Sequence, residues 1–215
     1  MRSDVELLEA WRAGDGAAGR ALFERHISAL SRFFRTKVGD EREDLIQGTF
    51  LSCVESRDRV RDGASFRAYL FRIARNKLYD HLARGHRGPS RPDPLTQSCV
   101  DLGASPSRLL AKSQQDQHLL LALRRLPVAL QILLELHYWE GLSTAELAQV
   151  LEIPQGTVKT RLFRARGLLR EQLESAAGMA GGDGSTGDGS TPSLPDLDAW
   201  ARSLRKLPDA PGGTR

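Results

Sequence analysis

The sequence has little sulfur and few aromatic rings. Only two of its 215 residues are cysteines, Cys53 and Cys99, and neither belongs to a Cys-x-x-Cys pair or has a histidine at metal-ligand spacing. These absences argue against a zinc site and against a disulfide framework. Aromatic residues make up 6% of the chain and hydrophobic residues 40%, so the expected core is rich in leucine and helical.

Long hydrophobic runs are missing as well. No stretch approaches the roughly 18 consecutive apolar residues that a membrane-spanning helix needs. The segment from Met1 to Glu6 already carries acidic side chains and lacks the apolar region of a signal peptide. We therefore expect a soluble, cytoplasmic protein that makes no contact with a membrane.

Strand patterns and catalytic patterns are equally scarce. No segment alternates apolar and polar residues over the length of a strand, and there is no internal repeat. The five histidines are scattered, and no glycine-rich phosphate-binding loop is present. We therefore expect an all-α protein that is not an enzyme and uses neither a metal nor another cofactor.

What the sequence does contain is helical periodicity, in two blocks separated by a segment rich in Pro, Gly and Ser. The predicted organisation is a helical domain at 5–85, a flexible linker at 86–107, a second helical domain at 108–177 and a tail at 178–215. The tail starts with a Gly/Ser/Asp tract and ends in an amphipathic segment, residues 194–207. We interpret that segment as a docking element; the alternatives are a disordered remnant or an anchor for another protein.

The sharpest pattern lies between Gly141 and Leu162. Gly141 suits the end of one helix, and Ser143 with Glu146 predicts a capping box at the start of the next. Apolar residues fall where a helix-turn-helix buries them, with the small Ala148 at the helix crossing. Glu152 occupies the turn position where many such motifs carry glycine, and a glutamate is tolerable there if its φ is not forced to be positive.

The second helix of this motif has a basic outer face. Five Lys or Arg residues and no acidic residue occur between Lys159 and Arg170, although the net charge of the chain is only +4. A helix of this kind can enter the major groove and present cations to base edges and phosphates. The alternative is a basic, solvated helix in an unrelated bundle.

A long helix is predicted from Ser65 to Arg84, in a basic stretch of the first domain. Residues 61–91 hold eight Lys or Arg against two acids. Cations interleaved with Asn76 and aromatic rings suit single-stranded DNA, in which phosphates need charge and bases need stacking. The alternative is that the aromatic residues belong to the core, which we favour for Tyr69. The side predicted to face away from the core holds Arg72, Arg75, Asn76, Tyr79 and Asp80.

Three stretches of the chain, which occur in the same order as in the family, resemble the extracytoplasmic-function (ECF) sigma factors of the sigma-70 superfamily. Residues 44–50 look like the family's core-polymerase-binding helix, DLxQETF. Residues 66–76 are similar to its promoter-melting helix, FxxWLYxIARN, and residues 141–166 resemble its helix-turn-helix. The match covers about residues 10–175 in the family order.

The resemblance implies two helical domains and a role for individual residues. RNA polymerase core (β′ and β subunits) would be bound through Asp44, Gln47 and Phe50. The −10 element would be bound and melted by Arg61, Ser65, Arg72, Asn76, Lys77 and Asp80, and loop 60–65 would hold a flipped base. The −35 element would be bound by Gln155, Thr157, Lys159, Thr160, Phe163 and Arg164. Promoter DNA and polymerase are thus the expected partners; an anti-sigma protein is a further candidate on which the sequence carries no signal.

The chain also departs from the family pattern. Gly48 replaces a glutamate and removes a polar contact with polymerase, Tyr69 replaces a tryptophan, and the aliphatic Val60 leaves base capture by its loop open. The tail has no counterpart in the minimal pattern. The competing interpretation is a stand-alone helix-turn-helix regulator, against which the predicted polymerase-binding and melting helices argue.

Overall fold

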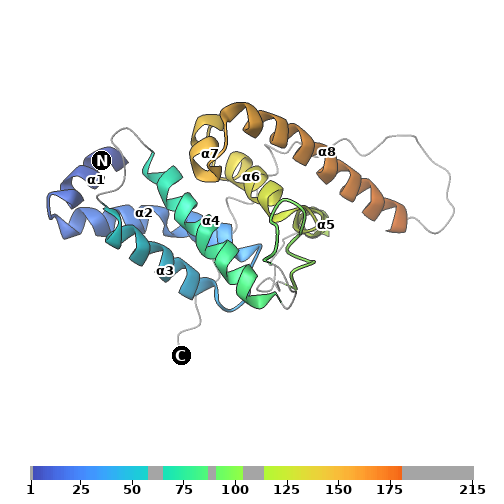
Figure 1. Cartoon of the computed structure of the whole chain (residues 1–215), viewed down its shortest axis with the longest axis horizontal. Coiled ribbons are helices and arrows are strands. Elements are labelled where there is room, and N and C mark those ends of the chain that lie inside the picture. Colours follow the sequence, from blue (N-terminus) through green and yellow to red (C-terminus); the bar gives the residue numbers. More distant parts are fainter. Residues whose placement is uncertain (1, 58–64, 87–90, 104–113, 181–215) are drawn as a thin grey trace.

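The computed structural model describes residues 2–57, 65–86, 91–103 and 114–180, and these residues fold into helices (Figure 1). Within these ranges no strand forms, and extended pairing is limited to one isolated bridge between Ser98 and Pro127. The all-α prediction is confirmed. The helices are α1 (Asp4–Arg12), α2 (Gly16–Arg35), α3 (Arg42–Glu55), α4 (Phe66–Gly85), α5 (Gln114–Arg124), α6 (Val128–Tyr138), α7 (Thr144–Leu151) and α8 (Gln155–Ala180).

Helices α1–α4 pack around a core of leucines and phenylalanines. Phe33 of α2 and Phe71 of α4 are both buried, with ring centroids 5.7 Å apart, and so join these two helices. Tyr69 is buried as expected, and its hydroxyl donates to the carbonyl oxygen of Ser56 at 3.0 Å. Packing of this core fixes the direction of α4 and therefore which of its side chains are exposed.

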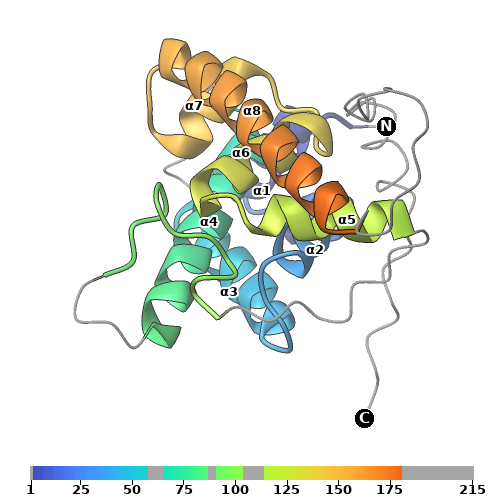
Figure 2. The ribbon, with the colours of Figure 1, turned by 90° about the vertical axis from the view of Figure 1, so that its right-hand side faces the viewer.

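Helices α5–α8 form the second group, with α6 at its centre. Every residue of α6 from Val128 to Leu136 is buried, because α6 packs against α7 and α8 on one side and against α2 on another (Figure 2). A predominantly apolar helix is expected in the middle of a structure, and the two buried polar side chains of α6 bond to each other: the Gln131 amide donates to the Glu135 carboxylate at 2.8 Å. The two groups of helices therefore share one continuous core.

The described part of the linker is packed against α6, although its Pro and Gly content predicted flexibility. Cys99 is fully buried, and the backbone N–H groups of Val128 and Ala129 donate to the carbonyl oxygens of Gln97 and Pro94. Asp93 and Asp101 accept hydrogen bonds from the turns of this segment. Turn-forming residues disfavour helix but are compatible with an ordered chain.

No described helix is long and apolar enough to cross a bilayer. The predicted tail helix at 194–207 and the loop at 60–65, apart from Ser65, lie outside the described residues. At the start of the tail, α8 continues to Ala180, three residues beyond the predicted end of the second domain.

Candidate nucleic-acid interface

Helices α7 and α8 form the helix-turn-helix. The capping box is present: the Ser143 side chain accepts from the Glu146 backbone N–H, and the Glu146 carboxylate accepts from the Ser143 N–H. Across the turn, the Gln155 side-chain amide donates to the Thr144 hydroxyl at 2.7 Å. Both helix starts are thus held by side chains that the sequence places next to the turn.

Glu152 has the positive φ that the sequence marks as the unfavourable case for a glutamate in this turn. Its φ is +56° and its ψ is +43°, so this residue ends α7 in the left-handed conformation that glycine adopts without strain. The Glu152 carboxylate bonds to the Arg75 guanidinium on α4 at 2.5 Å. A glycine would offer no such bond, so the side chain has a structural use that the motif alone did not reveal.

The predicted −35 residues share the outer face of α8. Gln155, Lys159, Thr160 and Arg164 are exposed, and Thr157 is half-buried. Phe163 is 78% exposed, an unusual value for a large apolar ring. Val158, Leu162 and Ala165 on the opposite face are buried in the core, as the helical spacing predicted for the first two. The packing therefore turns the basic face of α8 outward.

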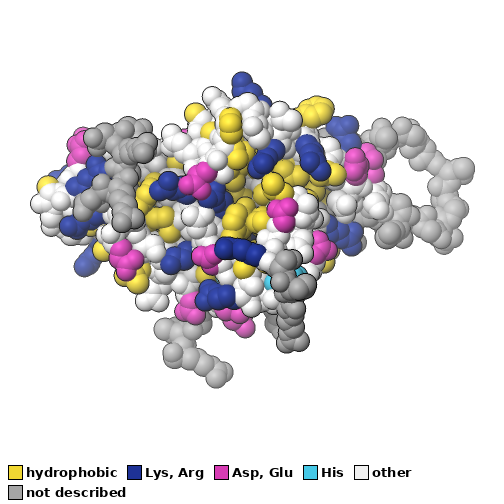
Figure 3. Space-filling model, viewed as in Figure 1, with side chains coloured by type: hydrophobic (Ala, Val, Ile, Leu, Met, Phe, Trp, Pro, Cys, Tyr) yellow, Lys and Arg dark blue, Asp and Glu magenta, His cyan; other side chains and the backbone are white. Residues whose placement is uncertain are grey.

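The cations of this face are available for a ligand. Among the described residues, neither Lys159 nor Arg164 takes part in an ion pair. Dark-blue side chains stand out along α8 at the upper edge of the space-filling view (Figure 3). Such a helix can supply phosphate contacts and base-edge contacts in a major groove.

The predicted −10 residues lie on α4, in less uniform surroundings. Ser65 caps the helix by accepting from the Ala68 N–H. Arg72 lies 3.7 Å from Glu152, and the exposed Asp80 pairs with Arg91 at 2.7 Å. The side chain of Asn76 is exposed, although its carbonyl oxygen accepts from Arg75 at 2.8 Å. Lys77 is half-buried, and Arg61 lies outside the described residues.

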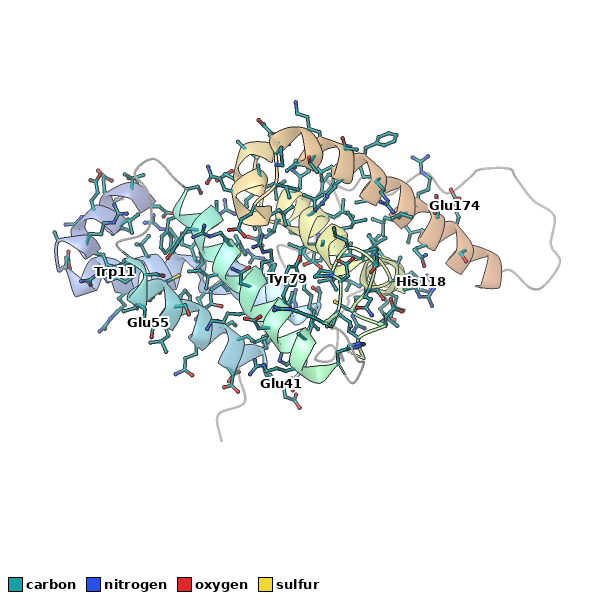
Figure 4. The ribbon with its side chains drawn as sticks, viewed as in Figure 1. Trp11, Glu41, Glu55, Tyr79, His118 and Glu174 are labelled. Carbon is teal, nitrogen blue, oxygen red and sulfur yellow. The ribbon has the colours of Figure 1, made fainter. Side chains whose placement is uncertain are left out.

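Two residues predicted to face away from the core are held at the junction with the second domain. Arg75 is buried, with a relative exposure of 7%, and it donates to the carbonyl oxygen of Val150. Tyr79, labelled in Figure 4, packs against the core below the Arg75 guanidinium, and burial raises its pKa to about 12. Helical spacing could not reveal this burial, because the covering residues come from another part of the chain.

The predicted polymerase-binding residues line a groove between α2 and α3. Asp44 and Gln47 are exposed and Phe50 is half-buried, its ring 4.5 Å from that of Phe23. The groove measures about 930 Å³. Its walls include three apolar side chains with large exposed fractions, namely Ile27 at 47%, Leu51 at 57% and Val54 at 43%.

The sequence motif did not identify the contribution of α2 to this groove. Phe23 and Ile27 lie four residues apart on α2 and face the groove. Their spacing is that of any amphipathic helix, so a partner surface could not be distinguished from a core stripe. The described residues contain no group of His, Cys, Asp and Glu arranged to bind a metal.

The fold and the exposed basic face of α8 define a helical DNA-binding protein of the helix-turn-helix class. The family model for Sigma-70 region 2 matches residues 22–88, and that for Sigma-70, region 4 matches residues 116–169. The ECF RNA polymerase sigma factor SigM of Mycobacterium tuberculosis is 33% identical over 174 residues, which are 80% of this chain and 85% of that protein. The chain belongs to the ECF sigma factors of the sigma-70 superfamily. It is thus a transcription initiation factor that directs RNA polymerase to promoters.

Two further proteins are similar to this chain, one in sequence and one in fold. The ECF RNA polymerase sigma-E factor of Haemophilus influenzae is 26% identical over 181 residues, covering 80% of this chain and 96% of that protein. The solved structure of CnrH in complex with the cytosolic domain of CnrY has a TM-score of 0.60 at 24% identity. It covers 80% of this chain and 97% of the CnrH chain, and it supports the arrangement of helices.

Proposed function

We propose that three separate surfaces carry the steps of promoter recognition. The α2–α3 groove binds core RNA polymerase, α4 binds and opens the −10 element, and the outer face of α8 binds the −35 element. The division into a first domain at 5–85 and a second at 108–177 follows from this assignment. The observation that carries it is the separation of an apolar groove from two basic helices on one chain.

The groove supports a protein partner. Exposed apolar side chains at its walls, with Asp44 and Gln47 beside them, form the apolar centre and polar rim of a protein–protein interface. Asp44 and Gln47 would contact the clamp coiled coil of the polymerase β′ subunit. Gly48, which follows Gln47, contributes no side chain to this contact.

A stand-alone helix-turn-helix regulator is the competing proposal. Such a regulator would need α7 and α8 but would have no use for an apolar groove on α2 and α3. The groove therefore favours the polymerase partner. We also propose that the chain acts in the cytoplasm and has no catalytic activity of its own.

An anti-sigma protein is a further candidate partner. The solved CnrH chain was captured with the cytosolic domain of CnrY, and a second similar structure holds the sigma factor RpoE of Bartonella quintana with the anti-sigma factor NepR. Co-purification from cells that express tagged full-length protein would identify such a partner here.

Run-off transcription on genomic DNA tests the proposal. Purified core polymerase should gain discrete start sites when this protein is added. The double variant Asp44→Ala, Gln47→Ala should bind core more weakly while remaining folded, because both side chains are exposed. A matched control is Glu9→Ala, Gln117→Ala, which removes the same charge and amide from exposed positions on α1 and α5 that do not line the groove. Core affinity equal to that of the unmodified protein would exclude the groove assignment.

A further inference from the structure

A side-chain hydrogen bond crosses the turn of the helix-turn-helix. The Gln155 amide donates from Nε2 to the Thr144 hydroxyl at 2.7 Å. Thr144 is the first residue of α7 and Gln155 is the first residue of α8, and these two helices pack against each other (Figure 1). The bond therefore joins the starts of two helices, although its residues are 11 positions apart in the sequence.

Other contacts already secure the fold of this motif. The start of α7 is capped by Ser143 and Glu146, so the Thr144 hydroxyl is not needed as a cap. Leu147 of α7 and Val158 of α8 are fully buried in the core. The Gln155 side chain is exposed, and a glutamine that nothing holds has several rotamers open to it. The main effect of the bond is thus to fix the direction of the Gln155 amide.

The held amide keeps one donor and one acceptor free. A glutamine amide carries two N–H donors and a carbonyl acceptor. Thr144 takes one N–H of Gln155, and within the part of the chain that the structure describes neither the second N–H nor Oε1 has a hydrogen-bond partner. The exposed side chain therefore presents an N–H and a carbonyl oxygen side by side, at the fixed spacing of a planar amide.

This donor and acceptor match the major-groove edge of adenine. Adenine presents the N7 acceptor beside the N6 amino donor, and a glutamine amide can bond to both at once. Guanine presents two acceptors, N7 and O6, so its recognition by an amide needs both N–H groups. One N–H of Gln155 is already bonded to Thr144. The hydrogen bond across the turn therefore favours adenine over guanine.

The position of the two residues suits a contact with a base. In helix-turn-helix proteins the first residues of the second helix reach base edges, while the first helix crosses the phosphate backbone. Gly156 follows Gln155, and nothing lies within 4 Å of the place that a Cβ atom would take there, so the surface beside the amide is open. The Thr144 hydroxyl accepts from Gln155 and keeps its own proton, which can donate to a phosphate oxygen.

We propose that Thr144 is a positioning residue, which holds the Gln155 amide for bidentate recognition of an adenine in the −35 duplex. The inference rests on the proposed role of α8. It specifies the chemistry of one base pair, an A·T pair whose adenine N7 and N6 atoms face the start of α8. Thr144 acts on this base preference only through Gln155.

The test uses holoenzyme, reconstituted from core polymerase and the full-length protein, on a promoter identified by run-off transcription. Each A·T pair of the −35 element is changed in turn to G·C with the purine kept on the same strand, and binding to the promoter fragment is measured by competition. Thr144→Val removes the hydroxyl at nearly constant side-chain volume, and Thr144→Ser keeps it. Thr96→Val is the matched control, because it makes the same change at an exposed threonine of segment 91–103.

We expect one A·T pair whose change to G·C weakens binding of the unmodified holoenzyme about tenfold. Gln155→Ala should remove this preference. Thr144→Val should reduce it to about threefold, whereas Thr144→Ser and the Thr96→Val control should leave it in place. In the Gln155→Ala background, Thr144→Val should have no further effect on base preference, because its effect passes through the missing amide.

A modified base tests the contact at the level of atoms. In 7-deazaadenine a carbon replaces N7, so the base lacks the acceptor for the Gln155 N–H but still pairs with thymine. Placed at the preferred adenine, it should weaken binding of the unmodified holoenzyme about fivefold. It should have no effect on the Gln155→Ala holoenzyme.

Three results would overturn the proposal. They are a Gln155→Ala holoenzyme that keeps every base preference, a Thr144→Val holoenzyme with unchanged preference, and a Thr144→Val holoenzyme that binds all sequences more weakly by one factor. The third is expected if the bond only stabilises the turn. Urea unfolding shows whether a variant is folded, and if Thr144→Val is not, Thr144→Ala replaces it and is judged by the same outcomes.

Failure of the proposed function would look different. If α8 does not bind the −35 element, Arg164→Ala will also leave every base preference in that element unchanged. If the chain does not direct polymerase to promoters, start sites will be absent from run-off transcription with the unmodified protein. Loss of the adenine preference alone, with Arg164→Ala still effective, concerns only Thr144 and Gln155.

Discussion

Arg75 in the middle of α4 and Glu152 in the turn of the helix-turn-helix form an ion pair, 2.5 Å between guanidinium and carboxylate, that joins residues 77 positions apart. The pair explains why a glutamate occupies a left-handed position. A non-glycine residue in that conformation costs roughly 1–2 kcal/mol. Here the backbone cost is offset by a partner for an arginine that would otherwise be buried without a counter-ion.

Two substitutions at Glu152 separate the backbone effect from the charge effect. Glu152→Gln and Glu152→Gly both remove the carboxylate, but only glycine adopts the positive φ of this position without backbone strain. The glycine variant should therefore be more stable than the glutamine variant by about 1 kcal/mol in urea-induced unfolding. Equal stability of the two variants would show that the turn is not strained.

Much of the fold could be predicted from the sequence, and the reason is local. Ser143 and Glu146 predict their capping box because every bond of that motif lies within four residues, and the stripe that includes Val158 and Leu162 is set by helical period alone. The exposed faces of α3 and α8 follow from the same period. Local chemistry is sufficient wherever the neighbours are close in sequence.

The burial of Arg75 could not be predicted, because it depends on contacts distant in sequence. The arginine lies on the polar side of α4 by helical period, but α7 covers that side. In the same way, the Lys37–Glu135 pair joins residues 98 positions apart, and neither side chain carries a local signal of burial. The packed linker segment 91–103 is a third case, since composition reports on the propensity of a segment and not on its neighbours.

The approach of Gly19 to Trp11 gives a stability prediction for the first domain. A Cβ atom at Gly19 would lie 2.6 Å from Trp11 Cδ1, which is closer than van der Waals contact allows. Gly19→Ala should therefore destabilise the protein by roughly 1–3 kcal/mol in thermal or urea unfolding. The control is Gly16→Ala in the first turn of the same helix, where nothing lies within 4 Å of the added atom. A Gly19→Ala variant as stable as the control would contradict the predicted clash.

The burial of His26 predicts that the protein loses stability in mild acid. Burial lowers its pKa below the usual 6.5, and the Asp4 carboxylate, 2.8 Å from Nε2, opposes this only in part. Because the folded-state pKa is the lower one, the unfolded chain binds more protons below pH 6.5. The contribution of His26 is thus fully present above that pH and is lost as the pH falls through the folded-state pKa.

Two measurements check this prediction. The free energy of unfolding should fall less between pH 7.5 and pH 5.5 in His26→Gln than in the unmodified protein. The ring resonances of His26 give its folded-state pKa directly by NMR titration. A titration midpoint above 6.5 would show that Asp4 outweighs burial, and the sign of the pH effect would then reverse.

The last prediction separates the two proposed DNA contacts, on a promoter identified by run-off transcription. Arg164 is exposed on the outer face of α8 and Asn76 is exposed on α4. Arg164→Ala should weaken binding to the −35 duplex by about 1–3 kcal/mol and relax base preference there, because a guanidinium that pairs with a base edge carries sequence information. Arg170→Ala removes the same charge from an exposed site further along α8, so it should weaken duplex binding less than Arg164→Ala and by the same factor for all sequences.

Asn76→Ala should leave −35 duplex binding intact and reduce promoter opening, measured by permanganate reactivity of unpaired thymines. If Arg164→Ala and Asn76→Ala weaken binding to every duplex by the same factor, both side chains act on phosphates alone, and the assignment of separate elements to α4 and α8 fails.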